Sequence, residues 1–179
     1  AANARIQGAL ARVAAAAIAA GRAPTEVAVV AATKGVEPVR MAAALDAGIR
    51  ALGENRAQEM LQKVQDPAVQ GRAPVWHFIG RLQRNKVRLL APYVDVWESI
   101  DRAELGAELA RRAPGAAVFV QVNIDGGASK GGCRPEAAGL LAEHLRSQGL
   151  DVRGLMVVPD PAGDPRRCEK PMTLTIRTR

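Results

Sequence analysis

A chain of 179 residues is long enough for one domain with a sizeable core, but it is shorter than the about 250 residues of a typical closed (β/α)₈ barrel. Hydrophobic residues make up 48% and charged residues 24%, which is ordinary for a globular protein and argues against overall disorder. The net charge of +7 invites a nucleic-acid partner, but only 3% of the residues are aromatic, which leaves no stacking platform for single strands.

The first 22 residues predict an amphipathic helix. Its polar side holds Gln7 and Arg12, and its apolar side comprises Ile6, Leu10, Val13 and Ile18. The segment has three arginines and no acid before Glu26, as transit peptides do, but the helix explains the same residues. No run approaches the about 18 apolar residues of a membrane span, so no membrane association is expected.

The stretch VAVVAATKG, residues 27–35, predicts a buried strand that ends on Lys34. An uncharged apolar run suits a strand covered on both faces of a parallel sheet, and α/β folds bind ligands at the carboxyl ends of such strands. At the mouth of an apolar barrel the lysine amine would lose hydration, which favours its neutral form, and a neutral amine forms a Schiff base with an aldehyde such as pyridoxal phosphate. The alternative is a solvated surface lysine, the common case for this residue type.

Strand and helix patterns then alternate along the chain. Helices are expected over 38–48, 56–65, 82–93, 102–113 and 136–149, and strands over 49–54, 75–79, 94–100, 117–124 and 151–159. Pro38 suits a first helical turn, Gly48 a helix end, and Asp101 an N-cap. Alternation with short connections predicts an α/β fold with a parallel sheet. Because the glycine motifs of Rossmann and P-loop proteins are missing, a TIM-type (β/α) barrel, or an incomplete one, of about six parallel strands plus an N-terminal helix fits the pattern better.

The cysteines and the basic residues carry no recognisable site. Cys133 and Cys168 have neither C-x-x-C nor metal-ligand spacing, so both thiols are predicted to be reduced and structural, and the protein cytoplasmic. The positive run of Arg81, Arg84, Lys86 and Arg88 is interpreted as a solvated helix face. Nucleic acid is therefore not expected as a partner.

Seven short motifs occur in an order that resembles one family. They are ATKG at 32–35, GENRAQE at 53–59, WHFIGRLQRNK at 76–86, ESID at 98–101, VQVNI at 120–124, SKGGC at 129–133 and RGLMVVP at 153–159. This succession resembles the pyridoxal phosphate homeostasis proteins, single-domain barrels related to the amino-terminal domain of alanine racemase. The resemblance runs from about Val27 to Pro159 and covers most of the chain.

The resemblance implies that Lys34 holds pyridoxal 5′-phosphate as a Schiff base. It also implies four further cofactor-binding residues, Asn55, His77, Ser99 and Met156. The first three end the next three predicted strands and should face the same mouth, and the Met156 thioether suits the face of an aromatic ring. The alternatives without a ligand are a helix cap for Asn55, a core histidine for His77, a turn residue for Ser99 and a core side chain for Met156.

The resemblance ends near residues 159–165. In the family, two further strand and helix units hold the cofactor phosphate and supply an arginine near the ring nitrogen. Here, residues 166–179 contain neither glycine nor alanine, and from Asp164 to Arg179 five bases and two acids supply +3 of the +7 charge. We expect a truncated barrel remnant over 1–165 and an atypical basic tail over 166–179. The remnant would have an open sheet edge, to which residues 172–178 could add a strand, and its affinity for the cofactor would be weakened.

The leading functional hypothesis is a monomeric, non-catalytic protein that binds pyridoxal phosphate and passes it to apoenzymes that depend on it. A racemase-like enzyme is the first alternative, but racemisation needs acid and base groups on both faces of the substrate carbon, and the only tyrosine, Tyr93, stands at the end of a predicted helix and does not end a strand. Binding through the basic surface or the open edge is a second alternative. A truncated product with weak or no cofactor binding is the third.

Overall fold

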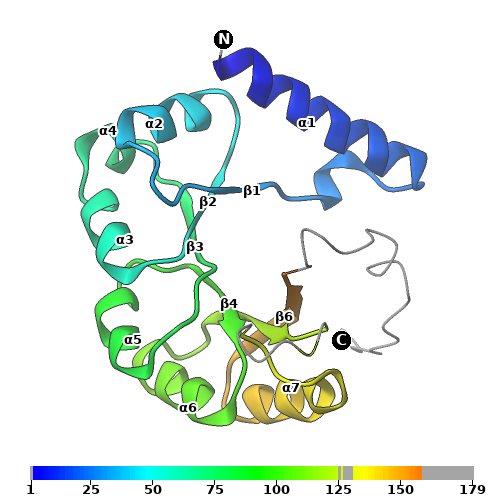
Figure 1. Cartoon of the computed structure of the whole chain (residues 1–179), viewed down its shortest axis with the longest axis vertical. Coiled ribbons are helices and arrows are strands. Elements are labelled where there is room, and N and C mark those ends of the chain that lie inside the picture. Colours follow the sequence, from blue (N-terminus) through cyan, green and yellow to red (C-terminus); the bar gives the residue numbers. More distant parts are fainter. Residues whose placement is uncertain (1, 125, 127–130, 159–179) are drawn as a thin grey trace. The chain divides into compact units, whose positions relative to one another are not determined.

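The computed structural model describes residues 2–124, 126 and 131–158. Six strands form one sheet in the order β1-β2-β3-β4-β5-β6, and the pairs β1–β2, β4–β5 and β5–β6 are parallel. The strands are β1 (Val30–Ala32), β2 (Ala51–Glu54), β3 (Val75–Phe78), β4 (Val96–Ile100), β5 (Ala117–Val122) and β6 (Asp151–Val157) (Figure 1). The predicted α/β fold of TIM type is confirmed, and the barrel is incomplete because β1 and β6 remain sheet edges within the described residues.

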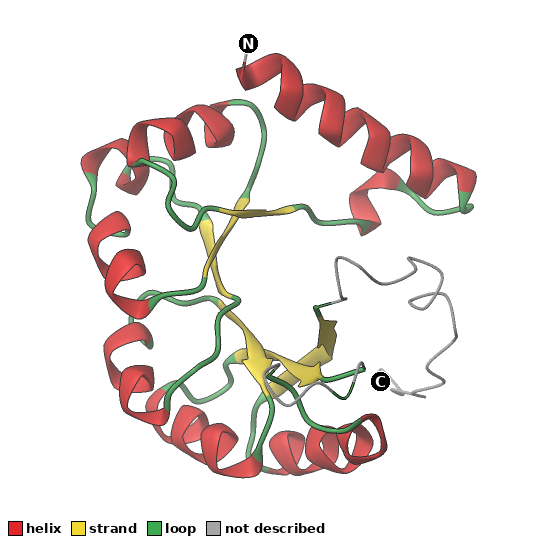
Figure 2. Ribbon diagram, in the orientation of Figure 1, coloured by secondary structure: helices red, strands yellow, loops and turns green. Residues whose placement is uncertain are grey.

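Helices alternate with the strands along the chain (Figure 2). They are α1 (Ala2–Ala19), α2 (Pro38–Asp46), α3 (Ala57–Lys63), α4 (Pro67–Gln70), α5 (Arg84–Leu90), α6 (Ala103–Arg112) and α7 (Ala138–Ser147), with 3₁₀ turns η1 (Pro24–Glu26) and η2 (Pro135–Ala137). The sequence does not predict α4, a four-residue helix that Asp66 caps by accepting a hydrogen bond from the Ala68 N–H at 2.9 Å. The chain divides into two compact units, Ala1–His77 and Phe78–Arg179.

In the first unit, a buried β2 shares a core with the helices before and after it in the chain. All four β2 residues are buried, and the core comprises Met41, Leu45, Leu52, Met60 and Val69. Pro38 occupies the first turn of α2, and Gly48 follows its end with φ 103°, as predicted. Proline and glycine therefore set the two ends of this helix in the way the sequence indicates.

One expectation for the first unit is wrong, and another holds only in part. β1 is half-buried to exposed rather than covered on both faces, because within the described residues it is an edge strand paired with β2 alone. The expected division of α1 into two sides holds in part: Ile6, Leu10 and Val13 are half-buried and Gln7 and Arg12 are exposed, but Ile18 is 64% exposed, and Gln7 donates to the Ala47 carbonyl at 2.5 Å. In a helix this rich in alanine, contact with the end of α2 decides which side faces inward.

In the second unit, α5, α6 and α7 lie along one side of β4, β5 and β6 (Figure 1). The rings of Phe78 and Trp97 contact at a centroid distance of 6.3 Å in its core. A Cβ atom on Gly106 would lie 2.0 Å from Cδ2 of Leu145, so α6 and α7 approach each other closely at this glycine.

The predicted N-cap role of Asp101 is wrong. The N-cap of α6 is Arg102, and no side chain caps this helix. Asp101 instead pairs with the Arg102 guanidinium at 2.5 Å and accepts a hydrogen bond from the Gly132 N–H at 3.4 Å. The carboxylate therefore holds the backbone at Gly132 rather than the first turn of α6.

Several predictions fall outside the described ranges. They are the domain boundary at residue 165, the tail 166–179 with its possible strand at 172–178, and Cys168. These stay predictions. None of the helices that can be described combines the length and apolar character that a membrane span requires.

Candidate functional site

Lys34 lies in a turn just beyond β1, at the strand end where the sequence places it. The Thr33 N–H donates to the Gly53 carbonyl at 2.9 Å, and the Val36 N–H donates to the Thr33 carbonyl at 2.9 Å, which closes a four-residue turn. Gly35 adopts φ 67°, a conformation that glycine reaches without strain. The Lys34 side chain is exposed, so the dry surroundings expected for its amine are not found. The edge position of β1 accounts for this exposure.

A buried ion-pair cluster lies against this turn. Lys63 on α3 is only 6% exposed, and Glu54 at the end of β2 is fully buried. The Lys63 ammonium donates to Oε1 of Glu54 at 2.7 Å, to Oε1 of Glu59 at 2.6 Å and to the Thr33 carbonyl at 2.6 Å. All three of its donors are therefore used. We call Glu54, Glu59 and Lys63 the Lys63 cluster.

The Lys63 cluster holds the backbone on both sides of Lys34. The Gly35 N–H donates to Oε1 of Glu59, and the Thr33 hydroxyl donates to Oε1 of Glu54 at 2.6 Å. The hydrogen bonds from Lys63 and from the Gly35 N–H lower the pKa of Glu59 because they favour its carboxylate form. The sequence prediction missed this cluster, although Glu59 and Lys63 stand four residues apart in a predicted helix and Glu54 is a charge within an apolar strand.

Asn55 directly follows β2, at the same end of the strand pair as Lys34. Both residues come two positions after the register pair Ala32↔Gly53. The Oδ1 atom of Asn55 is buried and has no hydrogen-bond partner within the structure, and the N-cap of α3 is Arg56, which makes no side-chain cap. The helix-cap alternative for Asn55 is therefore wrong. A buried acceptor without a partner is the kind of group that a bound ligand satisfies.

The other predicted site residues lie within strands rather than at their very ends. His77 is the third residue of β3 and is half-buried in the first unit. In the second unit, Ser99 is the fourth residue of β4, 2% exposed, with a buried hydroxyl oxygen that has no partner in the structure, so the turn alternative is wrong. Met156 is half-buried in β6, in register with Gln121 of β5.

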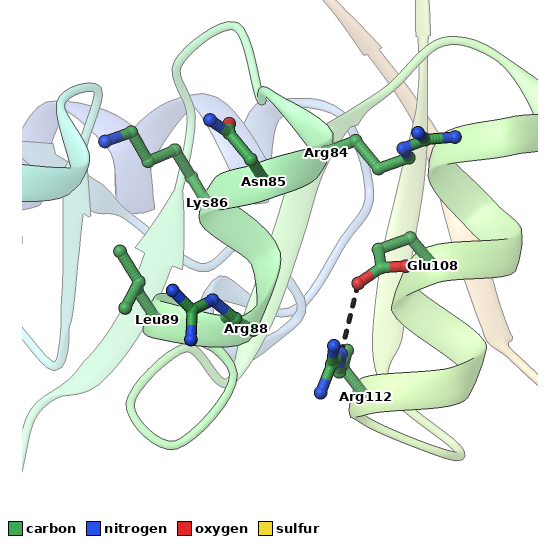
Figure 3. Close-up of a pocket in the computed structure, with 7 residues that line it drawn as sticks. All are labelled: Arg84, Asn85, Lys86, Arg88, Leu89, Glu108 and Arg112. Carbon is green, nitrogen blue, oxygen red and sulfur yellow. Dashed lines mark hydrogen bonds and ion pairs between the residues drawn. The ribbon is translucent and has the colours of Figure 1, made fainter.

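Two hollows on the second unit contain none of the predicted site residues. One, of about 410 Å³, lies between α5 and α6 and is lined by Arg84, Asn85, Lys86, Arg88, Leu89, Glu108 and Arg112. Figure 3 shows Arg84 and Lys86 extending in opposite directions, while Glu108 pairs with Arg112 at 3.1 Å. These cations do not converge on one point, which favours the solvated-face interpretation. The other hollow, of about 620 Å³, is lined by Arg81, Leu82, Gln83, Asp101 and Arg102.

Two sequence predictions concern metal ligands and the described cysteine, Cys133. Within the described part of the chain, no three His, Cys, Asp or Glu side chains are grouped to hold a metal ion. Cys133 is a free, half-buried cysteine, and burial raises the pKa of its thiol. A less acidic thiol agrees with the structural role predicted for Cys133.

Comparison with known proteins gives consistent results. Residues 8–175 match the family described as alanine racemase, N-terminal domain. The pyridoxal phosphate homeostasis protein of Pseudomonas aeruginosa is 39% identical over 160 residues, which are 86% of this chain and 68% of that protein.

Solved structures agree with the fold. A structure described as an unknown protein from Bifidobacterium adolescentis superimposes with a TM-score of 0.81 at 34% identity, covering 91% of this chain and 71% of that one. PipY of Synechococcus elongatus, solved with pyridoxal phosphate bound, superimposes with a TM-score of 0.70 at 26% identity, covering 89% and 74%.

Proposed function

Because this chain belongs to the alanine racemase N-terminal domain family, and within it to the pyridoxal phosphate homeostasis proteins, we propose that it binds pyridoxal 5′-phosphate through Lys34. The cofactor supplies an aldehyde, to which a neutral amine adds with release of water as a Schiff base forms. The observation that carries this proposal is an exposed primary amine at the carboxyl end of β1, in a turn whose backbone is hydrogen-bonded on both sides.

In each unit, one of the predicted contact residues has a buried polar atom that a ligand can use. Oδ1 of Asn55 and Oγ of Ser99 are both buried without a partner in the structure, so each has an unused place for a ligand hydrogen bond. We propose these two, with His77 and Met156, as the noncovalent contacts of the cofactor. A hydroxyl group of the cofactor would donate a hydrogen bond to Oδ1 of Asn55, and the Met156 thioether would contact the face of the cofactor ring.

We propose binding and delivery rather than turnover. The chain would hold pyridoxal phosphate reversibly as a monomer in the cytoplasm and release it to apoenzymes that need it. A racemase would require a second acid or base opposite Lys34. Tyr93 follows α5 in a turn, as predicted, and so gives that alternative no support.

Reduction with borohydride after incubation with pyridoxal phosphate tests the proposal. The chain has five lysines, Lys34, Lys63, Lys86, Lys130 and Lys170, so peptide mass spectrometry can compare them within one sample. We expect the added mass on Lys34 at the lowest cofactor concentrations, together with a visible absorbance band that Lys34→Ala abolishes and Lys86→Ala leaves unchanged. Label spread evenly over the surface lysines, or a band that survives in Lys34→Ala, would contradict the proposal.

A further inference from the structure

We infer that Glu59 and Lys63 are positioning residues for Lys34. This inference rests on the proposed function, because it assigns the two residues to the presentation of the cofactor-binding amine. Neither side chain would touch the cofactor. They act on the turn that carries Lys34, and through it on where the amine lies.

The contacts enclose Lys34 on both sides. The Thr33 carbonyl accepts from the Lys63 ammonium at 2.6 Å and from the Val36 N–H at 2.9 Å, while the Gly35 N–H donates to Glu59. Glu59 and Lys63 are themselves paired at 2.6 Å. The backbone groups before and after Lys34 are thus joined through one ion pair on α3, and the Lys34 side chain takes part in none of these hydrogen bonds.

The burial of the cluster makes this anchor stiff. Lys63 and Glu54 are almost entirely removed from water, where charged hydrogen bonds are stronger than at a surface. Glu54 ties the same ammonium to β2 at 2.7 Å, so the turn after β1 is fastened to both β2 and α3. A fixed turn narrows the region that the Lys34 amine explores, which lowers the entropy cost of meeting an aldehyde.

The cluster also separates the two lysines by reactivity. Lys63 is 6% exposed and donates all its ammonium hydrogens, whereas Lys34 is exposed and stands outside the cluster. An aldehyde in solution therefore meets Lys34 and not Lys63. The same ion pair that fixes the turn keeps its own lysine out of the reaction.

The test compares Glu59→Ala with the control Glu37→Ala. Glu37 precedes α2, is exposed, and makes no side-chain cap, so its removal changes the local charge without releasing the turn. In the chain without cofactor, we expect the amide exchange of Gly35 to rise about tenfold in Glu59→Ala, as the loss of a hydrogen bond to a charged group implies. Glu59→Gln, which keeps an acceptor oxygen, should restore part of the protection.

With pyridoxal phosphate added, the half-saturation concentration should rise about tenfold in Glu59→Ala and stay unchanged in Glu37→Ala. If exchange at Gly35 becomes faster in Glu59→Ala while the half-saturation concentration stays unchanged, the cluster is merely structural and the inference is overturned. Unchanged exchange at Gly35 in Glu59→Ala would overturn it as well. The proposed function fails separately, if the wild-type chain acquires no label on Lys34. The amide measurement reports on the turn in either case.

Discussion

At the scale of single residues, the polar atoms that lack partners are the most informative. Asn55 and Ser99 are predicted cofactor contacts, and each has a buried oxygen without a hydrogen bond in the structure. Lys63 shows the opposite situation, with every donor satisfied. An unsatisfied buried group costs stability and is retained where a ligand can use it, whereas a saturated one belongs to the scaffold.

Asn55→Ala is expected to weaken cofactor binding without lowering stability. Its Oδ1 has no protein partner to lose, so the melting temperature should stay within about 2 °C of wild type. Loss of one ligand hydrogen bond, about 1 kcal/mol, should raise the half-saturation concentration for pyridoxal phosphate about fivefold. Absorbance titration and thermal unfolding measure the two quantities. Asn85→Ala, at an exposed position of α5, is the matched control. A lower melting temperature of Asn55→Ala with unchanged cofactor binding would mean that Asn55 has a structural role.

At the scale of elements, short helices and strands are fastened by a few specific contacts. α3 has only seven residues, yet it carries both Glu59 and Lys63 and so anchors the turn after β1. In the second unit, α6 and α7 approach each other at Gly106, where a side chain would enter the space of Leu145. The fit between elements therefore depends on individual side chains, which single substitutions can test.

Gly106→Ala is expected to destabilise the chain even though alanine favours a helix. The new Cβ would meet the fully buried Leu145, and overpacking of this kind costs about 1–3 kcal/mol, more than the about 1 kcal/mol gained from helix propensity. Gly139→Ala on α7 is the control, because a Cβ at this position would have open space within 4 Å, and it should stabilise by about 0.5–1 kcal/mol. The urea concentrations at the midpoints of unfolding compare the stability of the two variants. Equal shifts in the two variants would contradict the close approach of α6 and α7.

At the scale of the whole molecule, the charge and the ligand act together. A net charge of +7 attracts an anionic phosphate ester to many surface positions, but such contacts are screened by salt and are not specific to the folded state. Binding at one site of the folded chain differs, because it stabilises that chain by mass action. Thermal stability at moderate salt therefore separates specific binding from charge attraction.

Pyridoxal phosphate is expected to raise the melting temperature by several degrees in about 0.15 M salt. At a concentration about a hundred times the dissociation constant, one site supplies about 2.7 kcal/mol, and about 1 kcal/mol corresponds to about 2–4 °C for a chain of this size. Lys34→Ala should lose most of this shift, whereas Lys86→Ala should keep it. An equal shift in Lys34→Ala would mean that the ligand binds elsewhere. Scanning fluorimetry over a cofactor series makes the measurement.

Much of the secondary structure followed from the sequence alone. The alternation of apolar runs with amphipathic segments, marked by Pro38 and Gly48, predicted the six strands and the major helices, because periodicity and turn residues are local properties. The position of Lys34 after β1 and of Asn55 after β2 followed in the same way, and the family resemblance identified them as candidates.

Only the tertiary structure decided how these candidates are held and covered. Glu59 and Lys63 reach the turn after β1 across 24 and 30 residues of sequence. The Asp101 carboxylate accepts from the Gly132 N–H rather than capping a helix, and Lys34 is exposed beyond β1, which is an edge strand among the described residues. Which side chain meets which backbone group depends on packing between elements far apart in the chain. Local periodicity does not determine such contacts. The sequence pattern therefore predicts that Lys34 lies at a strand end, and only packing between elements decides which side chains hold the turn that carries it.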